Sequence, residues 1–122
     1  MTEKPYVPGW LREFYAAVDG HDPSAIARFA DDMELSFGNH PVAQGRDAAL
    51  RTLATASQAF TATQHEFRHV WQVGDATICE FSATYTLTGG ATVTMPTAVV
   101  IERRGEQFAR MRMYLDEGAL SA

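Results

Sequence analysis

The chain has 122 residues, of which 46% are hydrophobic and 20% are charged, and this ordinary composition predicts one folded domain, residues 1–122. Its formal net charge is -5 and it contains no run of Lys or Arg, so we expect no nucleic-acid partner. The longest aliphatic run, residues 98–101, is too short to span a bilayer, and Cys79 is the single cysteine, so we expect a soluble cytoplasmic protein with no membrane partner and no internal disulfide.

The first third of the chain predicts an arm, two helices and a strand. Residues 1–9 are rich in Pro and Gly and predict an irregular N-terminal arm. Apolar residues then recur at helical spacing over 10–18. Asp22 followed by Pro predicts the N-cap of a second helix, which two aspartates end at 31–32. Residues 33–37 alternate apolar and polar side chains, which is typical of a strand.

The remainder predicts a third helix and a set of strands. After a loop at 38–45, an apolar stripe predicts a helix as far as Phe60. From there the hydrophobic period changes to two, and turn residues separate four strands joined as an antiparallel meander. These strands are expected at 62–73, 76–88, 91–102 and 106–116. In 76–88 alternation predicts one apolar face, which consists of Phe81, Ala83, Tyr85 and Leu87.

The order of elements predicts an α+β fold. Three N-terminal helices precede the main strands, and they must bury their apolar sides against one face of the sheet. In the strand 62–73, alternation predicts one inner face, with Val70 as the single exception; that face consists of His65, Phe67, His69, Trp71 and Val73.

Four sequence segments resemble the nuclear transport factor 2-like superfamily, and within it the SnoaL-like and ketosteroid-isomerase-like branch. These segments are FYAAVDGHDPSAIARFADDMEL at 14–35, QGRDAAL at 44–50, VGDATICEF at 73–81 and RMYLDEGAL at 112–120. The resemblance implies a cone-like curved antiparallel sheet wrapped against the helices, with a deep apolar pocket at its open end. It also implies a homodimer that pairs through the convex face of the sheet.

The resemblance does not extend to the best-known chemistry of that branch. Ketosteroid isomerases use a carboxylate base and an oxyanion hole made by a tyrosine and a protonated aspartate. By resemblance these three positions fall on Phe37, Phe14 and Ala98, which are all apolar. Isomerisation by that set of residues is therefore not expected.

Two further enzyme types of the superfamily match partly or not at all. The Asp–Arg–Asp set of limonene-epoxide hydrolases falls on Phe81, Ala83 and Met113, which lack the required groups. Scytalone dehydratases use an aspartate that ends the first helix and a histidine that opens the strand after the third helix. Those positions resemble Asp19 and His65, although the tyrosines expected beside them are missing.

His65 and Asp19 are the predicted catalytic residues. Imidazole exchanges protons near neutral pH, and a carboxylate can orient it. Two structural alternatives stay open: His65 as a strand-end histidine bonded to backbone or water, and Asp19 as a cap of its own turn. Residues 65–69 also match the HExxH pattern, but on a strand its histidines lie about 13 Å apart, too far for one zinc ion. We therefore predict no metal and no cofactor.

Eight apolar or aromatic side chains are predicted to bind substrate, because Met and aromatic residues adapt to irregular hydrophobic ligands. They are Phe14, Tyr15, Phe37, Trp71, Phe81, Tyr85, Met111 and Met113. The alternative for each is a place in the core.

The sequence thus predicts a SnoaL-like enzyme that isomerises, cyclises or dehydrates a hydrophobic or polycyclic substrate by cofactor-independent acid–base chemistry. The alternative is a protein of the same fold that binds a small hydrophobic molecule without catalysis, or an engineered scaffold of that fold. A histidine that reaches a cavity with a polar partner distinguishes the enzyme from these alternatives.

Overall fold

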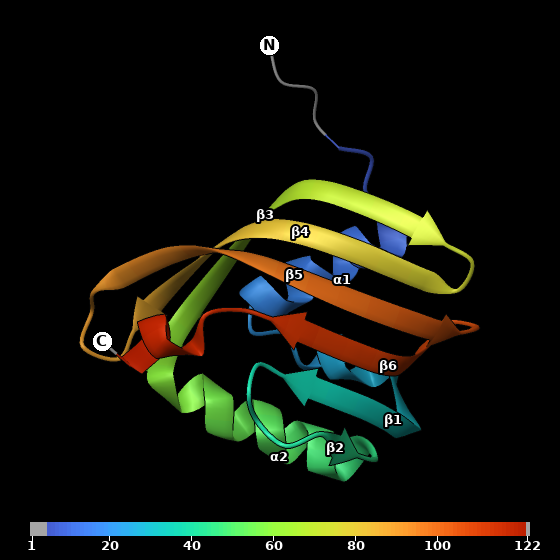
Figure 1. Cartoon of the computed structure of the whole chain (residues 1–122), viewed down its shortest axis with the longest axis horizontal. Helices are drawn as coiled ribbons and strands as arrows, with labels where there is room; N and C mark the ends of the chain where they lie inside the picture. Colours follow the sequence, from blue (N-terminus) through green and yellow to red (C-terminus); the bar gives the residue numbers. More distant parts are fainter. Residues whose placement is uncertain (1–4, 122) are drawn as a thin grey trace.

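A curved sheet of six strands carries helices on one face (Figure 1). The structure is a computed structural model and describes residues 5–121. Its elements are α1 (Gly9–Asp19), η1 (Pro23–Arg28), β1 (Phe29–Phe37), β2 (Ala43–Gln44), α2 (Arg46–Ala56), η2 (Ser57–Ala59), β3 (Phe60–Val73), β4 (Ala76–Leu87), β5 (Thr92–Arg104), β6 (Gln107–Tyr114) and η3 (Glu117–Ser121), where η denotes a 3-10 helix. The predicted α+β fold is confirmed.

The strands lie in the order β2-β1-β6-β5-β4-β3. Neighbouring strands are antiparallel except β1 and β6, which are parallel. The long strands β3 to β6 form the predicted meander, and β6 then lies beside β1 from the first third of the chain (Figure 1). Both long helices, α1 and α2, lie behind the sheet in this view.

The helix α1 begins one residue earlier than the sequence predicts. Residues 5–8 of the predicted arm form neither helix nor strand, and residues 1–4 lie outside the described residues. The Pro8 carbonyl accepts hydrogen bonds from the backbone N–H groups of Leu11 and Arg12, both 3.0 Å long. Gly9 therefore belongs to the helix and not to the arm.

The second helix is capped as predicted but is shorter. The Asp22 carboxylate accepts a hydrogen bond from the backbone N–H of Ser24 at 2.9 Å. The helix is of the 3-10 type and ends at Arg28, and Phe29 opens β1 opposite Phe108 of β6. The prediction that the aspartates at 31–32 end a helix is wrong, because pairing with β6 draws the preceding residues into the sheet.

The third helix also ends before the predicted position. It stops at Ala56, and Phe60 begins β3, where it pairs with Leu87 of β4. Within the predicted loop at 38–45, residues 43–44 form the short strand β2 against β1. The ends of these elements are therefore set by pairing with strands elsewhere in the sequence.

A β-bulge at Arg68 reverses the facing of the second half of β3. His65 and Phe67 pair with Ala83 and Phe81, but the next paired residue is His69, which lies opposite Glu80. The extra residue turns the following side chains over. Val70 therefore packs against the core, and the predicted inward positions of His69, Trp71 and Val73 are wrong. Trp71 is 47% exposed on the outer face, where its ring stacks on that of His69 at 5.4 Å.

The main core lies between α1 and the inner face of the sheet. Phe108 packs edge-on against Phe14, with the ring centroids 4.9 Å apart, and Leu11 and Ile101 are fully buried. The predicted inner face of β4 is confirmed, since Phe81, Ala83, Tyr85 and Leu87 are all buried. Burial of each large apolar side chain contributes about 1.5–3 kcal/mol.

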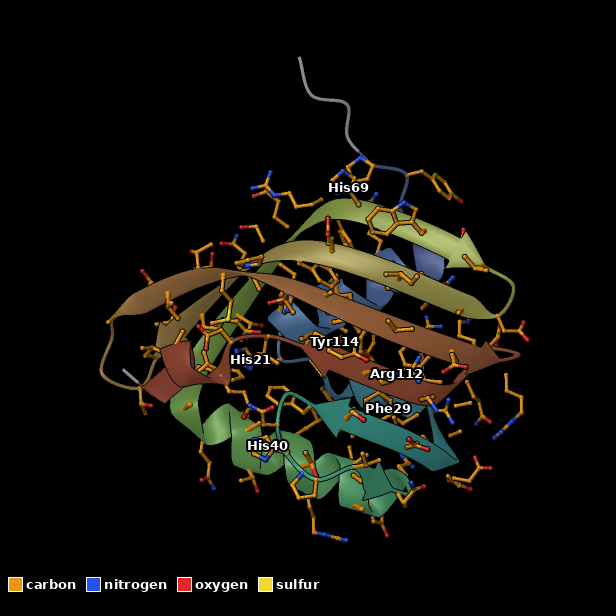
Figure 2. All side chains as sticks on the ribbon, viewed as in Figure 1. His21, Phe29, His40, His69, Arg112 and Tyr114 are labelled. Atoms are coloured by element: carbon orange, nitrogen blue, oxygen red, sulfur yellow. The ribbon has the colours of Figure 1, made fainter. Side chains whose placement is uncertain are left out.

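The C-terminal turn is fastened to the loop after β1 by Glu117. Its carboxylate accepts a hydrogen bond from the Asn39 backbone N–H and lies 2.8 Å from Nε2 of His40. Gly38 adopts a φ of +52°, which favours glycine, and a Cβ added to it would collide with the same carboxylate unless the Glu117 side chain moved. His40 (Figure 2) is consequently half-buried, although its polar loop predicts exposure.

No helix among residues 5–121 is long and apolar enough to cross a membrane.

The end of α1 is a Schellman turn with an unusual residue in it. The backbone N–H of Asp22 donates to the Ala17 carbonyl at 2.8 Å, and that of His21 donates to the Val18 carbonyl at 3.2 Å. His21 adopts a φ of +56° and is the one non-glycine residue with positive φ in the described chain. Glycine normally occupies this position because it has no Cβ to clash.

Replacing His21 by Gly is expected to stabilise the protein by about 0.5–1 kcal/mol, because the left-handed conformation is unstrained in glycine. Urea unfolding measures the change. His21→Ala is the matched control: it removes the imidazole but keeps the strain, so it gives no gain. Equal stability of the two variants would contradict the conclusion that the backbone conformation of His21 is strained.

Candidate functional site

A cavity of about 490 Å³ lies between the helices and the inner face of the sheet. This volume is within the range of small-molecule sites, about 300–1,000 Å³. Most of its wall is apolar and comes from Phe14, Tyr15, Val18, Phe29, Phe37, Leu50, Leu53, Phe60, Tyr85, Met111 and Met113. The polar residues that line it are His21, Asp22, Ser57, Thr63 and His65.

The structure brings six of the eight predicted substrate-binding residues to this cavity. These are Phe14, Tyr15, Phe37, Tyr85, Met111 and Met113. Phe81 does not line it, because the ring of Tyr15 covers that of Phe81 at a centroid distance of 4.5 Å. Trp71 lies on the opposite face of the sheet, so the prediction that it binds substrate in the pocket is wrong.

Asp19 and His65 form a close pair at the edge of the cavity. Oδ1 of Asp19 lies 2.6 Å from Nδ1 of His65, and Oδ2 accepts the backbone N–H of the same histidine at 2.9 Å. The Thr63 hydroxyl donates to Oδ1 at 2.9 Å. The carboxylate thus receives three hydrogen bonds from one strand, and it does not cap its own turn.

Local structure explains how residues so distant in sequence meet. Asp19 is the last residue of α1, where the Schellman turn ends the helix and frees its side chain. Thr63 and His65 lie two residues apart near the start of β3, so their side chains share the inner face. Thr63 is not among the site residues predicted from the sequence, although the period-two pattern places it on the same face as His65.

The Asp19 carboxyl is held ionised. Partial burial acts to raise its pKa, but hydrogen bonds from the side chain and backbone of His65 and from Thr63 outweigh burial and lower the pKa below its ordinary value. An ionised carboxylate has no proton to share, so in the neutral form of the imidazole the contact with Asp19 requires the proton on Nδ1. The second ring nitrogen, Nε2, is then unprotonated and takes no part in the bonds to Asp19.

Aromatic rings surround the His65 imidazole. The ring centroids of Tyr15 and Phe81 lie 4.8 and 5.2 Å from it, and that of Tyr85 lies at 6.5 Å. The His65 side chain is only 6% exposed. The imidazole therefore lies in an apolar, water-poor setting.

No three His, Cys, Asp or Glu side chains among residues 5–121 are placed to hold a metal ion. The bulge at Arg68 puts His65 on the inner face and His69 on the outer face, where His69 pairs with Glu80 at 2.8 Å. The prediction that the two histidines share a face is wrong. The HExxH pattern is an accident of sequence in this strand.

The geometry defines the α+β cone of the nuclear transport factor 2-like class, with a polar pair set in an apolar cavity. A sequence model of the SnoaL-like domain matches residues 11–111. The chain therefore belongs to the SnoaL-like domain family. No curated protein sequence matches it significantly.

Solved structures with the same fold are distant in sequence. A nuclear transport factor 2-like protein of unknown function from Burkholderia pseudomallei K96243 has a TM-score of 0.81 at 14% identity, over 91% of each chain. A putative polyketide cyclase from Xanthomonas campestris pv. campestris has a TM-score of 0.78 at 19% identity, over 91% of this chain and 90% of that one. A protein of ketosteroid isomerase-like fold from Catenulispora acidiphila DSM 44928, in complex with trimethylamine, has a TM-score of 0.77 at 19% identity, over 89% and 86%.

Replacing Asp19 by Asn is expected to cost about 1–3 kcal/mol of unfolding free energy at pH 7, because the His65 and Thr63 donors lose a charged acceptor. The folded-state pKa of Asp19 lies below its ordinary value of 3.8. Its stabilising effect is therefore complete above that value and disappears as the pH falls through the folded-state pKa. Urea unfolding at pH 7 and pH 3 measures both effects, and the difference between wild type and variant shrinks at pH 3.

Asp22→Asn is the matched control, because Asn caps a helix as well as Asp does. We expect little change from it at either pH. An Asp19→Asn variant as stable as Asp22→Asn would contradict the claim that the Asp19 carboxylate stabilises the fold.

Proposed function

We propose that this protein is an enzyme that moves a proton on a small hydrophobic or polycyclic substrate, without a cofactor. The observation that carries the proposal is the Asp19–His65 pair. Asp19 contacts Nδ1 of His65, which leaves Nε2 free, and His65 lines an apolar cavity. Nε2 accepts a proton from a substrate carbon and returns it to another substrate atom. Such a transfer serves isomerisation, cyclisation or dehydration, and none of these needs an oxidant or reductant.

The family supports this class of reaction without naming a substrate. One protein of the same fold is described as a putative polyketide cyclase. The cavity suits a small-molecule substrate, since its volume of about 490 Å³ is within the usual range for such ligands. A cytoplasmic location stays a prediction from the single cysteine, which is buried and free.

Hydrogen exchange on a simple ketone tests the proposal. 1-Tetralone and 1-indanone carry exchangeable protons next to a carbonyl, and NMR in D₂O follows their loss while also detecting binding. We expect wild type to accelerate exchange, and His65→Gln to reduce the protein-catalysed rate by roughly 10²–10⁴, the usual contribution of a general base.

His69→Gln is the matched control. His69 also contacts a carboxylate through Nδ1, at 2.8 Å from Glu80, but on the exposed outer face. This variant should exchange at the wild-type rate. If a ketone binds in the cavity and neither wild type nor variant exchanges it, the catalytic proposal is wrong.

A non-catalytic binder of a hydrophobic ligand is the second candidate. The observation that favours it is the cavity wall, which Phe14 and Phe37 line with apolar rings; by the sequence resemblance these two residues stand at the positions of the isomerase tyrosine and base. Binding of both ketones without exchange, and with unchanged affinity in His65→Gln, would establish this alternative.

We also propose that two copies pair through the outer face of the sheet. Trp71 and Tyr114 are 47% and 55% exposed there (Figure 2 labels Tyr114), and their strand partners include Ile78 and Ala98. The two long helices, α1 and α2, lie on the opposite face (Figure 1). Aromatic residues exposed on a sheet are typical of subunit interfaces.

Light scattering after gel filtration tests the pairing. Wild type is expected at twice the chain mass, and Trp71→Glu combined with Tyr114→Glu is expected at the chain mass, because two charges would be buried unpaired. Tyr6→Glu is the control, since Tyr6 is 78% exposed on the arm preceding α1. A monomeric wild type would overturn the proposal.

A further inference from the structure

The two long helices both end at the cavity. Ala17 and Val18 line it from the last turn of α1. Leu53, Ala54 and Ala56 line it from the last turn of α2. The C-terminus of a helix carries a partial negative charge, which a basic residue in the last turn commonly balances. Neither of these two turns contains a basic residue, so two uncompensated negative helix ends adjoin one cavity.

Two carboxylates add to the negative potential of the cavity. Asp22 lines it, and a hydrogen bond from the backbone N–H of Ser24 holds the pKa of the Asp22 carboxyl below its ordinary value. Asp19 bonds to Thr63 and His65, which line the cavity, and its pKa is lowered as well. Both carboxylates are therefore ionised at neutral pH. Charges of one sign around a cleft with apolar walls reinforce one another.

Positive charge is scarce around the same space. No Lys or Arg is among the described residues that line the cavity, and its basic side chains are the imidazoles of His21 (Figure 2) and His65. Arg28 belongs to η1, which contributes to the wall, but its guanidinium pairs with Glu13 at 3.1 Å. An anionic ligand would therefore meet two carboxylates with no Lys or Arg to balance them, whereas a cation would be attracted.

Aromatic rings make the wall suitable for one kind of cation. Six of them line the cavity: Phe14, Tyr15, Phe29, Phe37, Phe60 and Tyr85. Neighbouring rings are close, with centroids 4.9 Å apart for Phe14 and Tyr15 and 5.0 Å apart for Phe60 and Tyr85. The face of an aromatic ring carries negative partial charge, and walls of several rings recognise quaternary ammonium groups. The same rings bind the hydrocarbon part of such a molecule.

We propose that the cavity binds an organic cation, a hydrophobic molecule that carries a protonated tertiary amine or a quaternary ammonium group. The charged group lies between the ends of α1 and α2, and the hydrocarbon part lies against the aromatic rings. An organic cation fits better than a metal ion, since no three His, Cys, Asp or Glu side chains of the described chain are placed to hold one. This inference rests on the proposed function, because it gives the charge of the molecule that the same cavity binds.

Three probes of similar shape and different charge test the inference by binding alone. Benzyltrimethylammonium is a cation, neopentylbenzene is its uncharged carbon analogue, and phenylmethanesulfonate is an anion; none of them needs to react. Equilibrium dialysis gives the Kd of each probe. We expect wild type to bind the cation about 5–50-fold more tightly than the anion, because a unit charge a few ångströms from another changes affinity severalfold even in water.

Ser57→Lys places a positive charge at the cavity. Ser57 is exposed, lines the cavity and caps the C-terminus of α2, where a lysine is compatible with the helix. This variant should weaken cation binding by about 3–10-fold, strengthen anion binding by a similar factor and leave the Kd of neopentylbenzene unchanged. Asp22→Asn keeps the N-cap but removes a negative charge, so it should reduce the preference for the cation by about 2–5-fold.

Thr55→Lys is the matched control. It adds the same charge two residues earlier in the same helix, at an exposed position that is not among the residues lining the cavity, and it should keep the wild-type preference. A smaller preference in wild type than expected overturns the inference, and so does binding of neopentylbenzene without the cation or no binding of any probe. A preference that Ser57→Lys retains, or that Thr55→Lys loses equally, places the cation elsewhere and overturns it too.

The outcomes separate the cation site from the proposed catalysis. A cation preference that Ser57→Lys loses, together with no ketone exchange by wild type, supports the cation site and overturns the catalysis. Ketone exchange by a wild type that shows no cation preference does the reverse.

Discussion

The carboxylate of Asp19 joins the end of α1 to the start of β3, and the rest of the site depends on this connection. A negative charge at a helix C-terminus is unfavourable, because the helix dipole is negative there. Three donors of β3 offset that cost: the Thr63 hydroxyl, the His65 backbone and the His65 ring. The same bonds place the imidazole at the cavity and set which of its nitrogens carries the proton.

Stability and function make opposing demands on the inner surface. Phe81, Phe108 and Leu11 fill the main core completely, as a stable fold requires. Towards the mouth of the cone, side chains of α1, α2 and the sheet line a space of about 490 Å³ instead. Tyr15 belongs to both regions, since its ring packs on Phe81 and also lines the cavity, and its buried hydroxyl has no hydrogen-bond partner. A protein selected for stability alone would replace it by phenylalanine, and such trade-offs are common at functional sites.

One extra residue in β3, at the bulge, places side chains from the two halves of the strand on opposite faces of the sheet. Before the bulge, His65 and Phe67 face the helices; after it, Trp71 faces outward and Val70 takes the inner position. The bulge therefore lets one strand present His65 to the cavity and Trp71 to the outer face of the sheet. Bulges commonly redirect side chains near functional sites in this way.

The sequence alone determined the fold class, because period and turn chemistry are local properties that survive in any context. Alternation over 76–88 predicted the inner face of β4 correctly, and Asp22 predicted a real cap. Parity also selected His65, and its resemblance to a known position selected Asp19. Val70, the single exception to the alternation, was the one local sign of the bulge. The sequence alone does not show whether such an exception is an apolar residue on the outer face or an extra residue that turns the strand over.

Only the tertiary structure decided how distant segments meet. The parallel pairing of β1 with β6 moved Phe29 from a helix into a strand, and the pairing of β3 with β4 turned Trp71 outward. The short contact between Asp19 and His65 spans 46 positions of sequence. Hydrogen bonds and burial between segments far apart in the chain leave no periodic trace in either segment, so these features followed from folding and not from pattern.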